Sequence, residues 1–174
     1  MTVLDEEHDL IVVDPPWPLH KIIRACRPNQ GHNLDYRTMT LDEIFDFKFS
    51  VAPDAWLFCW STQRFLADAL RVVEIWGFKY LLTMTWDKRN GMCLMGFHWR
   101  TEFCVVGHRG HVETFRHGLA VPTIIAAKSP RHSEKPDAFY RAIEHLGKKR
   151  IDIFARKRRE GWDVWGDEID EVHG

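Results

Sequence analysis

The chain has 174 residues, of which 45% are hydrophobic and 28% are charged, and its formal net charge is −1. This composition excludes a disordered chain and indicates one globular domain, residues 1–174, large enough to bury a core. No apolar run approaches the roughly 20 residues of a membrane-spanning helix, and the acidic start lacks a signal-peptide pattern. We therefore expect a soluble, cytoplasmic protein with no membrane partner.

Strands and helices are expected to alternate along the chain. Apolar runs predict strands at residues 10–13, 55–60, 80–86, 102–106 and 151–154, with shorter ones at 123–126 and 162–165. One helix with an apolar stripe starts after Ser61 or Thr62 and ends near Trp76, and a second runs from Pro136 to Gly147. This alternation predicts an α/β fold with a mostly parallel, twisted sheet covered on both faces.

Three segments lack periodicity: residues 18–40, 88–100 and 107–122. Loops this long in a compact domain are usually lids or binding loops. The third holds three histidines, but their spacing is irregular and the four cysteines of the chain form no C-x-x-C pair. Neither pattern fits a zinc site, so we expect no metal.

Charge is unevenly distributed along the chain. Residues 86–160 carry 16 basic and 8 acidic side chains, a net charge of +8, whereas residues 1–85 and 161–174 carry −4 and −5. A basic block in a nearly neutral protein suggests a local basic face. Aromatic residues in the block favour base stacking or phosphate tracking over a plain solvated surface: Trp86, Phe97, Trp99, Phe103 and Phe115.

The most informative feature is Asp14-Pro15-Pro16-Trp17, which directly follows the apolar strand at 10–13. Two prolines end that strand, because neither can donate to a sheet ladder. The Asp14 carboxylate and the Pro15 carbonyl are then left at the carboxyl end of a strand, where open α/β sheets bind ligands. Two acceptors and a flat Trp17 ring suit an exocyclic amine on a planar base. The alternative is a plain turn with a core tryptophan.

Two further places suit a cofactor. Lys135 directly precedes the second helix, and the lysine and the helix N-terminus together could hold a ligand carboxylate; the alternative is a solvated side chain. Asp167 and Glu168 follow the last strand, where acids can accept ribose hydroxyls; the alternative is a polar turn. Neither a G-x-G-x-x-G pattern nor a P-loop occurs in the sequence.

Together these motifs carry a resemblance. They are Asp14-Pro15-Pro16-Trp17, Tyr36-Arg37-Thr38-Met39, His132-Ser133-Glu134-Lys135-Pro136, Phe154-Ala155-Arg156 and Gly161-Trp162-Asp163-Val164-Trp165-Gly166-Asp167-Glu168. In this order, over nearly the whole chain, they resemble the MT-A-type N6-adenine methyltransferases. The resemblance implies S-adenosylmethionine-dependent methyl transfer to adenine N6 in nucleic acid. It also implies a Rossmann-like fold with one antiparallel strand and a permuted motif order.

The resemblance implies roles for individual residues. Asp14, Pro15, Pro16 and Trp17 would form the catalytic tetrad, and Asp14 would also border the cofactor. Lys135 would hold the methionine carboxylate, and Arg156, Asp167 and Glu168 would meet the ribose and adenine of the cofactor. Residues expected to bind the nucleic acid are Tyr36, which would stack on a base, and Arg37, Lys88, Arg89 and Arg100, which would contact phosphates.

Several alternatives stay open at this point. The chain could be a catalytically silent, nucleic-acid-binding partner subunit, although the intact Asp14 motif disfavours this. It could methylate another planar amine, such as cytosine N4 or a glutamine side-chain amide, or be a structural protein with no ligand. DNA is favoured over RNA because the form is compact. A homo- or heterodimer is compatible with the aromatic residues of the long loops.

Overall fold

The computed structural model describes residues 2–18, 38–112, 120–128 and 134–166. Within these residues a seven-stranded sheet has the order β5-β3-β4-β2-β1-β6-β7. The strands are β1 His8–Val13, β2 Val51–Ser61, β3 Lys79–Leu94, β4 Phe97–Arg109, β5 Ile124–Ala126, β6 Arg150–Ile153 and β7 Asp163–Trp165. The helices are α1 Leu41–Asp46, α2 Leu66–Ile75 and α3 Asp137–Ile143, with 3-10 turns η1 Val3–Asp5, η3 Gln63–Phe65 and η4 Glu144–Leu146.

Strand direction confirms the predicted mostly parallel sheet with one antiparallel strand. β1 pairs in parallel with β2 and β6, and the pairs β6–β7 and β3–β5 are also parallel. β4 alone runs antiparallel, to both β2 and β3. The described part of the chain is therefore a Rossmann-like α/β structure.

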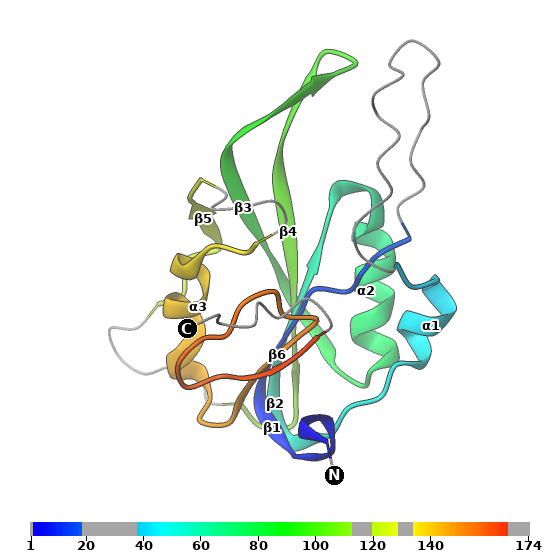
Figure 1. Cartoon of the computed structure of the whole chain (residues 1–174), viewed down its shortest axis with the longest axis vertical. Coiled ribbons are helices and arrows are strands. Elements are labelled where there is room, and N and C mark those ends of the chain that lie inside the picture. The colour runs from blue at the N-terminus through cyan, green and yellow to red at the C-terminus, as the bar shows by residue number, and fades with distance from the viewer. Residues whose placement is uncertain (1, 19–37, 113–119, 129–133, 167–174) are drawn as a thin grey trace, which may run out of the picture.

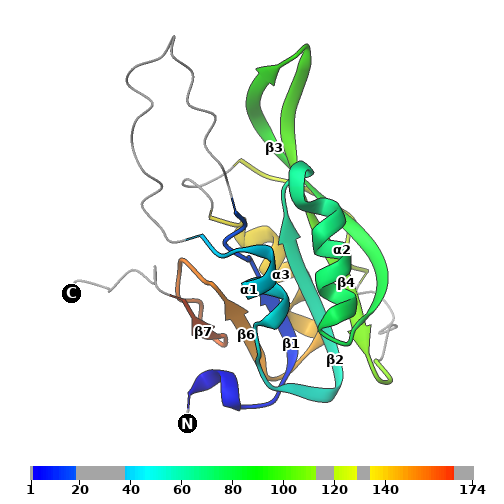
Figure 2. The same ribbon diagram turned by 90° about the vertical axis from the view of Figure 1, so that its right-hand side faces the viewer.

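Both faces of the sheet are covered, as expected for strands with nearly continuous apolar runs such as those in β1 and β2. α1 and α2 lie on one face and α3 on the other (Figure 1; Figure 2). Successive β2 side chains point to opposite faces, so Leu57 and Cys59 pack in the α2 layer, and Phe58 and Trp60 pack with Phe139 of α3. In the described residues, no helix is long and apolar enough to span a bilayer.

The prediction of a loop over residues 88–100 is wrong. β3 and β4 continue through it as a hairpin and join at Met95-Gly96, where both residues have positive φ, 53° and 81°. A two-residue turn with two positive φ values matches the twist of the flanking strands. Gly91 lies where an added Cβ would meet the backbone of Trp99, so the two strands approach closely there.

The other two predicted loops are partly described. Residues 19–37 and 113–119 lie outside the described residues. Residues 107–109, expected in the third loop, belong to β4. Helix α1 was not predicted, although the Thr40 hydroxyl accepts from the Glu43 amide (3.2 Å) and the Glu43 carboxylate accepts from the Thr40 amide (2.7 Å). That reciprocal capping box is readable from sequence as Thr-x-x-Glu.

Candidate active site

Asp14 lies at the carboxyl edge of the sheet, in the position that the sequence predicted. Its amide donates to the Ile153 carbonyl at 3.2 Å, which extends the β1–β6 pairing by one residue before the prolines stop it. The Pro15 carbonyl accepts from the Trp17 amide at 2.8 Å, and the Pro16 carbonyl accepts from the Met39 amide at 2.9 Å. Pro15 therefore presents a fixed carbonyl, which keeps a second lone pair for another donor.

The Trp17 ring is packed into the core. It is 5% exposed, stacks on the Phe65 ring at 5.4 Å with an interplanar angle of 9°, and its indole Nε1 donates to the Trp60 carbonyl at 3.0 Å. These contacts fix the tryptophan that ends the motif, and its burial leaves almost none of the ring open to solvent. Stacking of a target base on Trp17 stays a prediction.

Four side chains of alternating charge form a chain of ion pairs that begins at Asp14. The Lys135 ammonium lies 2.8 Å from the Asp14 carboxylate and 3.2 Å from that of Glu102, and the Lys88 ammonium lies 3.0 Å from Glu102. Lys135 is 8% exposed, and its ammonium sits 5.3 Å from the centre of the Trp60 ring. Glu102 was not among the predicted site residues.

Burial and pairing set the protonation of this charge chain. Burial raises the pKa of Asp14 despite the neighbouring Lys135 ammonium. Burial alone would lower the pKa of Lys135, but Asp14 and Glu102 outweigh it and raise that pKa. Burial alone would raise the pKa of Glu102, but the ammonium groups of Lys135 and Lys88 outweigh it, so this pKa is lowered. Lys135 is thus held as a cation between two acids.

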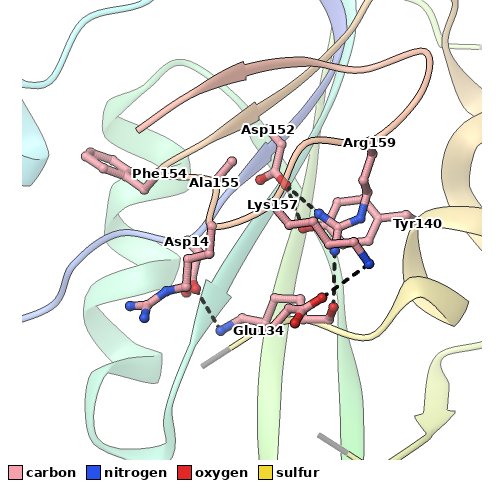
Figure 3. A pocket seen from close by; sticks show the side chains of 10 residues that line it. Asp14, Glu134, Tyr140, Asp152, Phe154, Ala155, Lys157 and Arg159 are labelled. Carbon is pink, nitrogen blue, oxygen red and sulfur yellow. Dashed lines mark hydrogen bonds and ion pairs between the residues drawn. The ribbon is translucent and has the colours of Figure 1, made fainter. Parts of the chain in front are cut away.

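A pocket opens between the end of β6 and the start of α3 (Figure 3). Its lining mixes both signs of charge: Asp14, Glu134, Lys135, Tyr140, Asp152, Phe154, Ala155, Arg156, Lys157 and Arg159. The predicted residues Asp14, Lys135 and Arg156 are brought together here. The Arg156 guanidinium also lowers the pKa of Asp14, against the stronger effect of burial. Such a pocket suits a ligand that itself carries both charges.

Asp152, a buried acid within β6, also lines the pocket. The Tyr140 hydroxyl donates to Asp152 Oδ2 at 2.8 Å, and Arg159 Nη1 lies 3.3 Å from the same oxygen. The Arg159 guanidinium stacks 3.6 Å from the centre of the Tyr140 ring. Burial raises the pKa of Asp152 to about 7, although Tyr140 and Arg159 both act to lower it. Asp152 was not among the predicted site residues, although an acid between Ile151 and Ile153 in an apolar strand indicates a special role.

A strained turn at Phe154 directs the chain into the pocket. Phe154 has φ of 60°, a left-handed conformation that costs a non-glycine residue about 1–2 kcal/mol. Its ring packs against Phe47 and Trp165 at 5.0 and 5.2 Å, away from Asp152 and Arg159 (Figure 3). The Ala155 amide donates to the Trp165 carbonyl at 3.1 Å, and this leads the chain to Arg156.

Three predicted phosphate contacts lie on the β3–β4 hairpin, away from the pocket lining. Lys88 pairs with Glu102, and Arg100 Nη2 pairs with Asp87 Oδ2 at 2.6 Å. Arg89 is exposed, with φ of 62°. Tyr36, Arg37, Asp167 and Glu168 lie outside the described residues, so their predicted roles stay predictions.

The Rossmann-like sheet and the Asp14-Pro15-Pro16-Trp17 motif at its carboxyl edge are the features expected of the N6-adenine methyltransferases that the sequence resembles. Residues 8–168 match the MT-A70 family, and the chain belongs to that family. The predicted family membership is confirmed.

Relatives of known function agree with this. The chain is 29% identical over 178 residues to the N(6)-adenosine-methyltransferase catalytic subunit METTL3 of Homo sapiens, covering 94% of this chain and 28% of that protein. It is 30% identical over 186 residues to the Type II methyltransferase M.MunI of Mycoplasma sp, covering 94% and 78%. The Drosophila melanogaster MT-A70-like protein is 28% identical, covering 99% and 28%. The chain therefore spans under a third of its animal relatives.

Proposed function

We propose that this chain transfers the methyl group of S-adenosylmethionine to the N6 amine of adenine in nucleic acid, with DNA favoured over RNA. One observation carries the proposal: the Asp14 carboxylate and the fixed Pro15 carbonyl lie at the carboxyl edge of β1, and Asp14 lines a pocket that contains Lys135 and Arg156. DNA is favoured because the form is compact: the chain covers 78% of the length of the Type II methyltransferase of Mycoplasma and 28% of that of METTL3.

The residues of the pocket fit S-adenosylmethionine. Its amino-acid end carries a carboxylate and an ammonium, and the pocket offers Lys135, Arg156 and Arg159 for the first and Asp14 and Asp152 for the second. Two of the three Lys135 N–H donors face Asp14 and Glu102, so one stays available for a ligand carboxylate. When bound, the cofactor supplies an electrophilic methyl group on a sulfonium.

Asp14 and Pro15 would act on the target amine. The N6 lone pair of adenine is delocalised into the ring, so the amine is a poor nucleophile. Hydrogen bonds from its two N–H groups to the Asp14 carboxylate and the Pro15 carbonyl favour a pyramidal nitrogen, whose lone pair then points at the methyl carbon. Methyl transfer would form an N–C bond as the S–C bond breaks, and the nitrogen would become cationic. Asp14 stabilises that charge, and the excess proton leaves afterwards.

Access to the base is a separate requirement. In a duplex the adenine must leave the stack, which costs a few kcal/mol. Stacking of the target base on Tyr36 is proposed to offset this cost by about 1–3 kcal/mol. Stacking on Trp17 would first require the buried ring to be uncovered. Arg37, Lys88, Arg89 and Arg100 are proposed to hold phosphates.

The test is direct identification of the product. The purified chain is incubated with methyl-labelled S-adenosylmethionine and, separately, with DNA and RNA pools, and the digested nucleosides are analysed by mass spectrometry. We expect N6-methyladenine in DNA and less or none in RNA. Label on cytosine N4 instead would make the chain a cytosine methyltransferase. A chain that binds nucleic acid but no cofactor would be a silent partner subunit.

A further inference from the structure

The β3–β4 hairpin extends past the edge of the sheet that carries Asp14. Phe103 of β4 pairs with Ser61, the last residue of β2, so residues 97–102 have no β2 partner. At the rise of a strand these six residues reach about 20 Å beyond that edge. Both views show the hairpin projecting from the body of the molecule (Figure 1; Figure 2). We name residues 88–101 the arm.

The arm displays large apolar side chains to solvent. Met95, Phe97 and Trp99 are 87%, 73% and 46% exposed. Isolated exposed apolar residues are normal. Three within five positions of one protruding hairpin form an apolar surface, and these side chains do not contribute to the core. Their conformation is defined by a paired ladder, Met92 with Trp99 and Leu94 with Phe97. A paired ladder presents the two rings from a fixed backbone.

The arm is also purely basic. Its residues include Lys88, Arg89 and Arg100 and no aspartate or glutamate, in a protein whose net charge is −1. Lys88 and Arg100 are paired with acids at the base of the arm, Glu102 and Asp87. Among the described residues the Arg89 guanidinium makes no ion pair, and its side chain is exposed. The arm thus keeps the positive charge of Arg89, which a polyanion complements.

The base of the arm is joined to the candidate active site. Glu102, which follows the arm, contacts both Lys88 of the arm and Lys135, and Lys135 contacts Asp14. A strand lying along the arm would therefore run toward the carboxylate proposed to hold the target amine. Flat rings combined with cations are the usual surface for single-stranded nucleic acid, because every base has a stacking face and every linkage a phosphate.

From these observations we propose that the arm is a nucleic-acid-binding element. Phe97 and Trp99 stack on bases that flank the target, and Arg89 contacts a backbone phosphate. The proposal rests on the proposed function for its substrate class, but binding by the arm can be measured without methyl transfer.

The experiment compares matched pairs of exposed apolar residues on the same hairpin strands. Phe97→Ser with Trp99→Ser alters the arm. Tyr80→Ser with Leu81→Ser alters two other large exposed residues, 42% and 46% exposed, at the opposite end of β3. Affinity is measured by fluorescence anisotropy with labelled single-stranded DNA and RNA of about 12 nucleotides. We expect the arm variant to lose about tenfold or more in affinity, and the control variant to bind as the parent chain does.

A second pair tests the phosphate contact. Arg89→Gln removes an arm cation, and Arg109→Gln removes an exposed cation at the far end of β4. The slope of log affinity against log salt should fall by about 0.7 for Arg89→Gln and stay unchanged for Arg109→Gln. Equal slopes for the two variants would remove Arg89 from the interface.

Two outcomes would overturn the proposal. One is unchanged nucleic-acid affinity in the arm variant. The other is sedimentation of the parent chain as a dimer and of the arm variant as a monomer, which would make the arm a contact between copies. Calorimetry with S-adenosylmethionine tests the proposed function separately from the arm. If the parent chain binds oligonucleotide through the arm but binds no cofactor, the role of the arm is supported and the methyltransferase proposal is contradicted.

Discussion

The Asp14 carboxylate offers two acceptor oxygens and a negative charge. The proposed methyl transfer needs the charge, because it stabilises the cationic nitrogen. Asp14→Asn keeps the shape and one acceptor but cannot stabilise a cationic nitrogen. We expect methyl transfer to fall about 100-fold or more, as for loss of a preorganised electrostatic contact. Cofactor affinity should fall much less than methyl transfer, because Lys135 keeps its Glu102 partner and Asp152 still lines the pocket. Single-turnover methyl transfer and calorimetry together measure this, and normal transfer by the variant would contradict the mechanism.

Lys135 should matter for binding more than for chemistry. Lys135→Gln removes the cation proposed to hold the cofactor carboxylate, so we expect the dissociation constant to rise about tenfold or more, with a smaller change in turnover at saturation. The variant also leaves two buried acids without their shared cation, a change that costs about 3–5 kcal/mol of stability. Lys135→Arg restores the charge and serves as the control for folding. Unchanged cofactor affinity in a folded Lys135→Gln variant would place the carboxylate elsewhere.

At single residues, the sequence predicted those that lie where a strand ends or a helix begins. Asp14, Lys135 and Arg156 were expected near a ligand, and the fold brings all three to one pocket. Glu102 and Asp152 were missed because each lies inside a strand, where the apolar neighbours dominate the pattern. The contact between Glu102 and Lys135 joins β4 to the segment before α3. Local periodicity does not say which side chains from such distant segments meet.

Among the elements, the turn after β6 depends on Gly166. A Cβ there would lie 2.8 Å from the Ala155 carbonyl oxygen and 2.9 Å from its nitrogen, so Gly166→Ala must displace the turn that carries Arg156. We expect cofactor affinity to fall about tenfold or more, together with a loss of stability of about 1–3 kcal/mol. Gly77→Ala is the control, because Gly77 has φ of 83° with nothing near an added Cβ.

The control separates backbone strain from a role in the site. Gly77→Ala should cost about 1–2 kcal/mol of stability through its left-handed conformation and leave cofactor affinity unchanged. Chemical denaturation and calorimetry give the two quantities for each variant. Equal cofactor affinity in the two variants would show that the Phe154 turn does not position the cofactor pocket.

Elements were predictable where one pattern held over several residues. The apolar runs of β1, β2 and β6 and the stripes of α2 and α3 were all found. The outer half of the hairpin was not, because the β3–β4 register shifts between Asp87 and Met92 and breaks the alternation. Gly91 allows the two strands to approach closely there, and Gly96 forms a tight turn. The short helix α1 was not predicted, because only six residues follow its capping box and they are too few to show a helical period.

For the molecule as a whole, the sequence predicted the layers and missed the strand order. Alternating strands and helices imply a parallel sheet with helices on both faces, and that is the arrangement found. Insertion of β4 between β2 and β3 depends on long-range pairing, which no local pattern encodes. This insertion is also what places the arm beyond the edge that carries Asp14, so the pocket and the proposed nucleic-acid surface share one end of the sheet.

Global stability should depend on pH through Asp152. Its pKa is about 7 in the folded chain and near 3.8 when unfolded, so between these values the folded state binds the extra proton. The stabilisation is complete below the unfolded pKa and is lost as pH rises through 7. Relative to Asp152→Asn, which keeps an oxygen for the Tyr140 hydroxyl, the parent chain should lose about 2 kcal/mol of unfolding free energy between pH 5 and pH 8. Urea denaturation of both proteins across that range measures the difference, and a constant gap would mean that Asp152 stays ionised in the folded chain.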